Sequence, residues 1–160
     1  MTAHQAALEA LTRYFGYDSF RPGQQGIVEA LLAGRDVLGV MPTGAGKSVC
    51  YQIPAALSPG VTLVISPLIS LMRDQVDALN DLGLPAAFIN TTQTPDEQAM
   101  VFAQAAAGQI KLLYVAPERL ETGRFRDFAA RTPISLIAVD EAHCVCLLYT
   151  SPSPRDRTRS

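Results

Sequence analysis

Residues 41–48 read Met-Pro-Thr-Gly-Ala-Gly-Lys-Ser, and this stretch lies directly after a short apolar run. Gly44 and Gly46 let the backbone turn so that its N–H groups point inward, which makes a nest for phosphate oxygens. Lys47 can reach the outer phosphates of a nucleotide, and the hydroxyl of Ser48 can hold Mg²⁺. A strand, this loop and a helix follow one another in the required order. The sequence therefore favours a phosphate-binding loop over an ordinary glycine turn with an incidental lysine.

Short apolar runs recur along the chain with helical segments between them, a pattern typical of strands buried on both faces of a sheet. This alternation predicts an α/β fold, with a mainly parallel sheet flanked by helices and two helices before the first strand. Ligands of such folds bind at the carboxyl ends of the strands. The expected strands are residues 37–41, 61–65, 86–89, 112–115 and 136–139, and the expected helices are 2–15, 22–33, 70–82 and 95–107.

An acidic motif, Asp140-Glu141-Ala142-His143, follows the last expected strand. Asp140 stands where a second anchor for a metal ion would lie in the same sheet, and Glu141 is placed to accept a proton from an attacking water. Two surface carboxylates at a strand end are the alternative interpretation. The phosphate loop elsewhere in the chain favours the catalytic one.

Two more expected strands end in a proline followed by a helix start, at Ser66-Pro67 and at Ala116-Pro117. Each turn offers free N–H groups that can bind a phosphate. Either turn alone is better interpreted as a plain strand-to-helix connection. Their matched placement on the edge that carries the phosphate loop favours a second anion-binding role.

The composition excludes several classes of protein. The chain has 160 residues, enough for one domain, and its 48% hydrophobic residues exclude global disorder. No apolar run approaches the ~20 residues that span a bilayer. Residues 1–150 carry ten Lys and Arg against fourteen Asp and Glu, so any nucleic-acid contact there must come from a local basic patch. Three cysteines and no secretory leader predict a reduced, cytoplasmic protein.

Several stretches together match one known family: residues 14–17, 20–24, 41–48, Cys-Tyr-Gln-Ile-Pro-Ala at 50–55, Ser-Pro-Leu-Ile-Ser-Leu-Met-Arg-Asp-Gln at 66–75, Tyr-Val-Ala-Pro-Glu-Arg-Leu at 114–120 and Val-Asp-Glu-Ala-His-Cys at 139–144. From about residue 11 to residue 145 the chain resembles the RecQ family of superfamily-2 ATP-dependent DNA helicases. DEAD-box RNA helicases share the two nucleotide motifs, but their acidic motif ends in Asp where this chain has His143.

The resemblance implies a RecA-like P-loop NTPase fold and a motor that couples ATP hydrolysis to 3′-to-5′ unwinding of DNA, in repair and recombination. It also implies a role for each matched residue. The implied adenine contacts are Tyr17, Arg21 and Gln24, and the implied phosphate and Mg²⁺ contacts are Thr43, Gly44, Ala45, Gly46, Lys47 and Ser48. By the same resemblance, Asp140 holds the metal through water, Glu141 activates the hydrolytic water and His143 couples the ATP site to DNA. The positions at which the family contacts one DNA strand are Ser66, Arg73, Pro117 and Arg119.

The match to this family stops after Val145. We therefore expect residues 1–145 to form a partial, truncated first motor domain, and residues 146–160 to be a disordered or foreign tail. A basic tail that touches nucleic acid is the alternative. The resemblance places one more strand between the phosphate-loop strand and the acidic-motif strand, so we expect a gap there, or a closing-up that shifts Asp140 relative to Ser48.

The second RecA-like domain of the family has no counterpart in the 160 residues, so we expect this chain alone to be inactive as a motor. Three interpretations follow. We favour a fragment of a DNA helicase, and the alternatives are a stand-alone nucleotide-binding module and an inactive truncated product.

Overall fold

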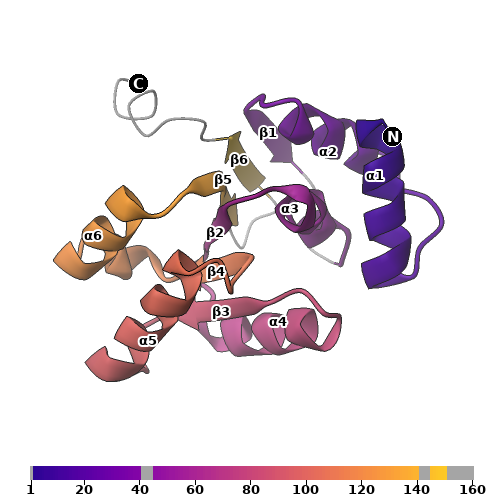
Figure 1. Cartoon of the computed structure of the whole chain (residues 1–160). Coiled ribbons are helices and arrows are strands. Elements are labelled where there is room, and N and C mark those ends of the chain that lie inside the picture. The colour runs from indigo at the N-terminus through magenta and orange to yellow at the C-terminus, as the bar shows by residue number, and fades with distance from the viewer. Residues whose placement is uncertain (1, 41–44, 141–144, 151–160) are drawn as a thin grey trace.

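The computed structural model describes residues 2–40, 45–140 and 145–150 (Figure 1). Strands and helices alternate along most of the chain, as the apolar runs predicted. The elements are α1 (Ala3–Ala10), a π-helical turn (Leu11–Phe15), α2 (Gln24–Leu32), β1 (Val37–Val40), α3 (Ala45–Leu57), β2 (Val61–Ile65), α4 (Ile69–Asp81), β3 (Ala86–Ile89), α5 (Pro95–Ala106), β4 (Leu112–Val115), a 3₁₀ turn (Pro117–Arg119), α6 (Gly123–Arg131), β5 (Ile134–Asp140) and β6 (Val145–Thr150).

The strands form one six-stranded sheet in the order β1-β6-β5-β2-β4-β3. Strands β5, β2, β4 and β3 are parallel to one another, which confirms the predicted parallel α/β sheet. Strand β6 is antiparallel to both β1 and β5, so β1 runs in the same direction as the parallel strands. The carboxyl ends of β1 and β5 therefore lie at the same edge of the sheet, with β6 between them.

Strand β6 corrects two expectations. Residues 146–150 are not in an unstructured tail, because they lie in β6. The expected gap between β1 and β5 is also wrong, since β6 pairs with both strands. An apolar run, Val-Cys-Leu-Leu-Tyr-Thr, supplies the missing backbone partners that two facing strand edges require. Only four residues join β5 to β6, too few for the crossover that a parallel neighbour needs, so the strand enters antiparallel.

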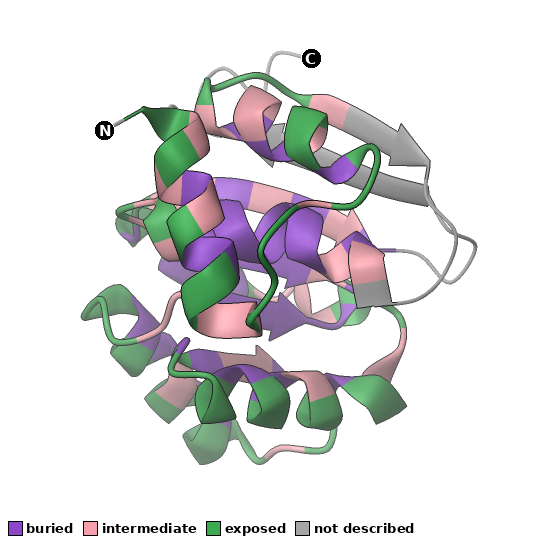
Figure 2. Cartoon of the chain, turned by 90° about the vertical axis from the view of Figure 1, so that its right-hand side faces the viewer, coloured by how far each residue is buried: buried purple, intermediate pink, exposed green. Residues whose placement is uncertain are grey.

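Helices cover both faces of the sheet. Helices α3 and α4 share one buried cluster with inward residues of the strands, whereas α5 and α6 share another on the opposite face. Within β2 the side chains alternate between these clusters, with Val64 in the first and Leu63 in the second. The buried residues concentrate in the central strands and in α3 (Figure 2). Helix α3 is buried because α1 and α2 pack over its outer side.

Two helices begin with a reciprocal side-chain cap. Thr2 and Gln5 form a reciprocal capping box at α1, and Thr94 and Glu97 form a second one at α5. Helix α6 was not predicted. Its start is marked in the sequence only by Thr122, the N-cap residue, whose side chain accepts a hydrogen bond from the backbone N–H of Phe125. Within the described part of the chain, no helix is long and apolar enough to cross a bilayer.

Candidate nucleotide site

The sheet brings the lysine of the glycine-rich loop to the first carboxylate of the acidic motif. Lys47 lies in the first turn of α3 and Asp140 is the last residue of β5. The Nζ atom of Lys47 lies 2.5 Å from Oδ1 of Asp140. The two residues are only 8% and 5% exposed. Each charge therefore compensates the other in a region from which water is largely excluded.

Lys47 and Asp140 are in contact even though β6 lies between β1, the strand before the Lys47 loop, and β5, which ends at Asp140. The first turn of α3 reaches the end of β5, because Lys47 in that turn contacts Asp140. Lys47 contacts the Asp140 carboxylate directly. The expected shift of Asp140 relative to Ser48 stays a prediction.

Gln24 connects the N-terminal helices to the phosphate-loop segment. Its side-chain Oε1 accepts a hydrogen bond of 2.8 Å from the backbone N–H of Arg21, and its Nε2 donates one of 2.8 Å to the carbonyl oxygen of Gly46. The residue is 4% exposed. An amide has two donor hydrogens and two acceptor lone pairs, and these two bonds to described residues use one of each, which suits the amide to bind a ligand as well.

Gly46 is needed for this close approach. A Cβ atom built there would lie 3.1 Å from Nε2 of Gln24 and 3.7 Å from a terminal guanidinium nitrogen of Arg21. The first of these contacts is tighter than ordinary van der Waals separation and the second is ordinary, so a side chain at residue 46 would make the Gln24 amide shift by a few tenths of an ångström. The sequence interpretation gave Gly46 a role in the turn, and the structure adds this packing role.

The three residues expected to hold adenine line one small pocket. Tyr17, Arg21 and Gln24 surround it together with Gly46, and its volume is about 110 Å³. Tyr17 is 49% exposed, which leaves its ring accessible to a planar partner. The pocket lies against the first turn of α3, so a ring seated in it would be next to the phosphate-loop segment.

Two residues of the site carry oxygen atoms suited to a magnesium ion. Mg²⁺ prefers carboxylate and hydroxyl oxygens and usually binds few protein groups. The buried carboxylate of Asp140 and the hydroxyl of half-buried Ser48, which follows Lys47, are donors of this kind. These residues fit the expected ion. Thr43, Gly44, Glu141 and His143 lie outside the described residues.

The residues expected to contact DNA follow two neighbouring strands, β2 and β4. Ser66 is buried, and its hydroxyl accepts a hydrogen bond of 3.2 Å from the backbone N–H of Leu68, so it stabilises its own turn. Arg73 is exposed, with its guanidinium 5.8 Å from the centre of the Phe88 ring. Their contact with DNA stays a prediction.

The turn after β4 carries the other two expected DNA contacts. Pro117 is exposed and Arg119 is half-buried. The Nε atom of Arg119 is enclosed and has no hydrogen-bond partner among the described residues. The two turns lie side by side, since the N–H of Ser66 donates to the carbonyl of Val115 at 3.2 Å.

Comparison with known proteins identifies the family. Residues 21–148 match the model of the DEAD/DEAH box helicase family. The chain belongs to this family. It is 52% identical to the ATP-dependent DNA helicase RecQ of Haemophilus influenzae over 139 residues, and 46% identical to that of Bacillus subtilis over 140 residues. Each alignment covers 87% of this chain but only 22% and 24% of the relative. The chain thus spans under a quarter of the length of these proteins.

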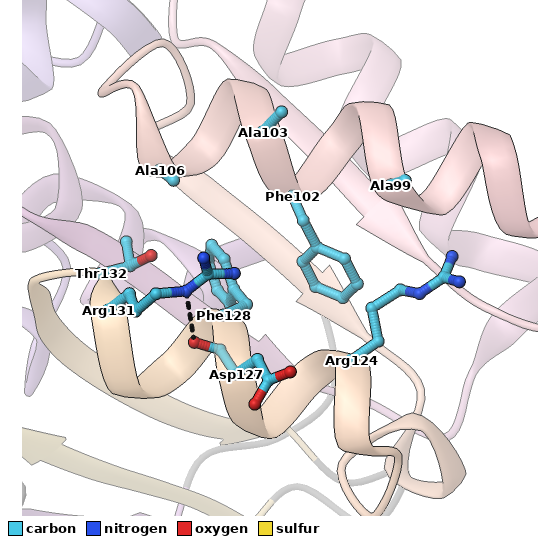
Figure 3. Close-up of a pocket in the computed structure, with 9 residues that line it drawn as sticks. All are labelled: Ala99, Phe102, Ala103, Ala106, Arg124, Asp127, Phe128, Arg131 and Thr132. Atoms are coloured by element: carbon cyan, nitrogen blue, oxygen red, sulfur yellow. Dashed lines mark hydrogen bonds between the residues drawn. The ribbon is translucent and has the colours of Figure 1, made fainter.

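A second hollow in this DEAD/DEAH box helicase chain lies apart from the site. It is a groove of about 540 Å³ between α5 and α6, floored by Phe102 and Phe128 and bordered by Arg124 and Arg131 (Figure 3). The Arg131 side chain turns back along its own helix, where its Nε donates to the carbonyl of Asp127. None of the expected site residues of this helicase chain lines the groove.

The structure also places residues that motif reasoning passed over beside the ion pair. The hydroxyl of Tyr51 donates to Oδ2 of Asp140 at 3.4 Å, and the hydroxyl of Tyr114 lies 3.5 Å from that of Tyr51. Tyr51 belongs to the Cys-Tyr-Gln-Ile-Pro-Ala stretch and Tyr114 to the Tyr-Val-Ala-Pro-Glu-Arg-Leu stretch. The available signal was the spacing of Lys47 and Tyr51, because residues four apart share one face of a helix.

Proposed function

We propose that these residues form the ATP-binding and ATP-hydrolysing part of a RecQ-type 3′-to-5′ DNA helicase motor. The observation that carries the proposal is the buried contact of Lys47 with Asp140, beside the pocket formed by Tyr17, Arg21 and Gln24. It joins a loop suited to phosphates, a carboxylate suited to a metal and a slot suited to a base. The similarity to the RecQ proteins supports the choice of DNA.

The ion pair implies an exchange when nucleotide binds. Lys47 would turn from Asp140 to the outer phosphates, where a charge-assisted contact to an anion replaces the one it leaves. Asp140 would then be free to hold Mg²⁺ through water, with the hydroxyl of Ser48 as a second oxygen donor. Bound Mg²⁺ supplies neutralisation of charge that develops on the phosphates.

The remaining roles follow the family pattern. The backbone of residues 43–48 would cradle the phosphates, Glu141 would take the proton of the attacking water, and His143 would pass the state of the ATP site to the DNA-binding turns. We propose that Arg73, Pro117 and Arg119 contact one DNA strand, with Ser66 shaping its turn. A second RecA-like domain would close over the nucleotide in the complete motor.

We further propose that the family's motor sequence in this chain is residues 1–145, that residues 146–160 lie beyond it although residues 146–150 pair into its sheet, and that the protein acts in the cytoplasm. The family model matches residues 21–148, so it ends close to the proposed boundary at residue 145.

The test is ATP affinity, measured by calorimetry in Mg²⁺ for the chain and for Lys47→Ala. The only other lysine, Lys111, donates to the carbonyl of Ser58 at 2.8 Å and provides the matched control Lys111→Ala. Losing one charge-assisted phosphate contact costs about 1.5–3 kcal/mol, which is roughly a 10- to 150-fold loss of affinity. The control should bind as the unchanged chain does. Equal ATP affinity in all three proteins would refute the proposal.

A further inference from the structure

A group of buried polar side chains lies under α3 and ends on Asp140. Tyr51 and Tyr114 are fully buried, and Gln52 and Asp140 are nearly so. Two of them come from α3, one from β4 and one from the end of β5. Because β2 lies between β4 and β5, the group bridges a strand and connects two carboxyl ends of the sheet.

The number of protons on each side chain decides which atom donates in each hydrogen bond of this group. The amide Nε2 of Gln52 donates to the hydroxyl oxygen of Tyr114 at 3.4 Å, and the hydroxyl of Tyr51 donates to Oδ2 of Asp140 at 3.4 Å. A hydroxyl has one proton, so Tyr51 has none left for Tyr114. The 3.5 Å contact between the two hydroxyls must therefore run from Tyr114 to Tyr51. All three donors point toward the carboxylate.

Burial keeps the hydroxyl of Tyr114 protonated, so that it can act as a donor. Desolvation raises the pKa of Tyr114; it outweighs the lowering effects of the hydrogen bonds with Tyr51 and Gln52, and the negative charge of Asp140 adds a smaller raising effect. The phenol of Tyr114 is therefore neutral around pH 7. Aligned hydrogen bonds polarise one another, so the whole chain strengthens the last donor, the hydroxyl of Tyr51.

The two oxygens of Asp140 have different partners. Lys47 holds Oδ1, and Tyr51 donates to Oδ2. If Lys47 moves to the phosphates, the carboxylate loses the partner on Oδ1 and keeps the one on Oδ2. We propose that Tyr51, supported by Tyr114 and Gln52, is a positioning residue that holds the Asp140 carboxylate in place for Mg²⁺. This inference rests on the proposed function, because it concerns the metal site of that same nucleotide pocket.

The experiment compares ATP affinity in Mg²⁺ with ATP affinity in EDTA. Tyr51→Phe removes one hydroxyl and keeps the ring, and Tyr14→Phe is the same change at a tyrosine outside the site. The contacts are long, so a modest effect is expected: Tyr51→Phe should lower the gain in affinity from Mg²⁺ by about 3- to 10-fold, with affinity in EDTA unchanged. Tyr114→Phe should give a smaller loss of the same kind, and Tyr14→Phe none.

Other outcomes overturn the inference and separate it from the proposed function. An unchanged Mg²⁺ gain in Tyr51→Phe, or an equal loss of affinity with and without Mg²⁺, refutes the positioning role alone. If thermal melting shows that Tyr51→Phe does not fold, Tyr114→Phe decides, and an unchanged Mg²⁺ gain there refutes the role. If the unaltered chain binds no ATP, or binds it equally with and without Mg²⁺, the proposed function fails and the inference fails with it.

Discussion

Removing one partner of the buried ion pair should destabilise the nucleotide-free chain more than removing both. Lys47 and Asp140 are each more than nine-tenths buried and in direct contact. Deleting one member of such a pair leaves an uncompensated charge and costs about 3–5 kcal/mol. Tyr51 still donates to Asp140 in Lys47→Met, which places the expected cost at the low end, about 3 kcal/mol.

The double variant Lys47→Met with Asp140→Asn removes both charges and keeps similar volumes. It should lie within about 1 kcal/mol of the unaltered chain, because replacing a whole buried pair is often close to neutral. The corresponding melting temperature of Lys47→Met should fall by about 6–12 °C, at 2–4 °C for each kcal/mol in a chain of this size.

The assay is urea and thermal unfolding followed by circular dichroism, without nucleotide, for the chain, both single variants and the double variant. The double-mutant cycle isolates the coupling between Lys47 and Asp140 from their separate contributions. Strictly additive effects, or a Lys47→Met cost below about 1 kcal/mol, would show that the pair is solvated and that its burial does not govern its energy.

Three further results are expected. Gly46→Ala should displace the amide of Gln24 and reduce the preference for ATP over GTP in competition binding, and an unchanged preference would contradict the packing argument. Burial raises the pKa of Cys50 to about 11, so mass spectrometry should find its peptide alkylated about a hundredfold more slowly at pH 8 in the folded than in the unfolded chain. Hydrogen bonds from Thr94 lower the pKa of Glu97 in the folded chain. The unaltered chain should therefore be more stable than Glu97→Gln above the pKa that Glu97 has in the unfolded chain, and this advantage should disappear as the pH falls through its pKa in the folded chain. A difference in urea midpoints that does not change with pH would refute this.

The strands were predictable where burial on both faces forces an uninterrupted apolar run. Residues 61–65 and 112–115 were predicted at the bounds the structure shows, because β2 and β4 are internal strands covered by helices on each side. Strand β6 was not predicted because the composition of residues 151–160 is typical of disorder. The six apolar and β-favouring residues before position 151 were assigned to the same tail. Helix α6 was missed because it carries three arginines and an aspartate, so only Phe125 and Phe128 mark its inner face.

The pairing of loop and acidic motif could be anticipated from sequence, because both motifs follow strands and strand ends share an edge. Lys47 and Asp140 accordingly meet. The hydrogen-bonded pair Tyr51 and Tyr114 could not be anticipated, since the two residues are far apart in sequence and each is typical of an ordinary core aromatic residue. Their contact depends on how α3 crosses the sheet, which no local pattern specifies.

The place of β6 also has a consequence for how the chain folds as it is synthesised. Val37 of β1 pairs with Leu148 of β6, so an early strand finds its neighbour only near the far end of the polypeptide. The four parallel strands can assemble once residue 140 has left the ribosome, whereas β1 must wait for residues 145–150. Pairings between such distant residues form late, because loop closure has to come first. Strands β6 and β1 would then be the last to join the sheet, next to four parallel strands that are already paired.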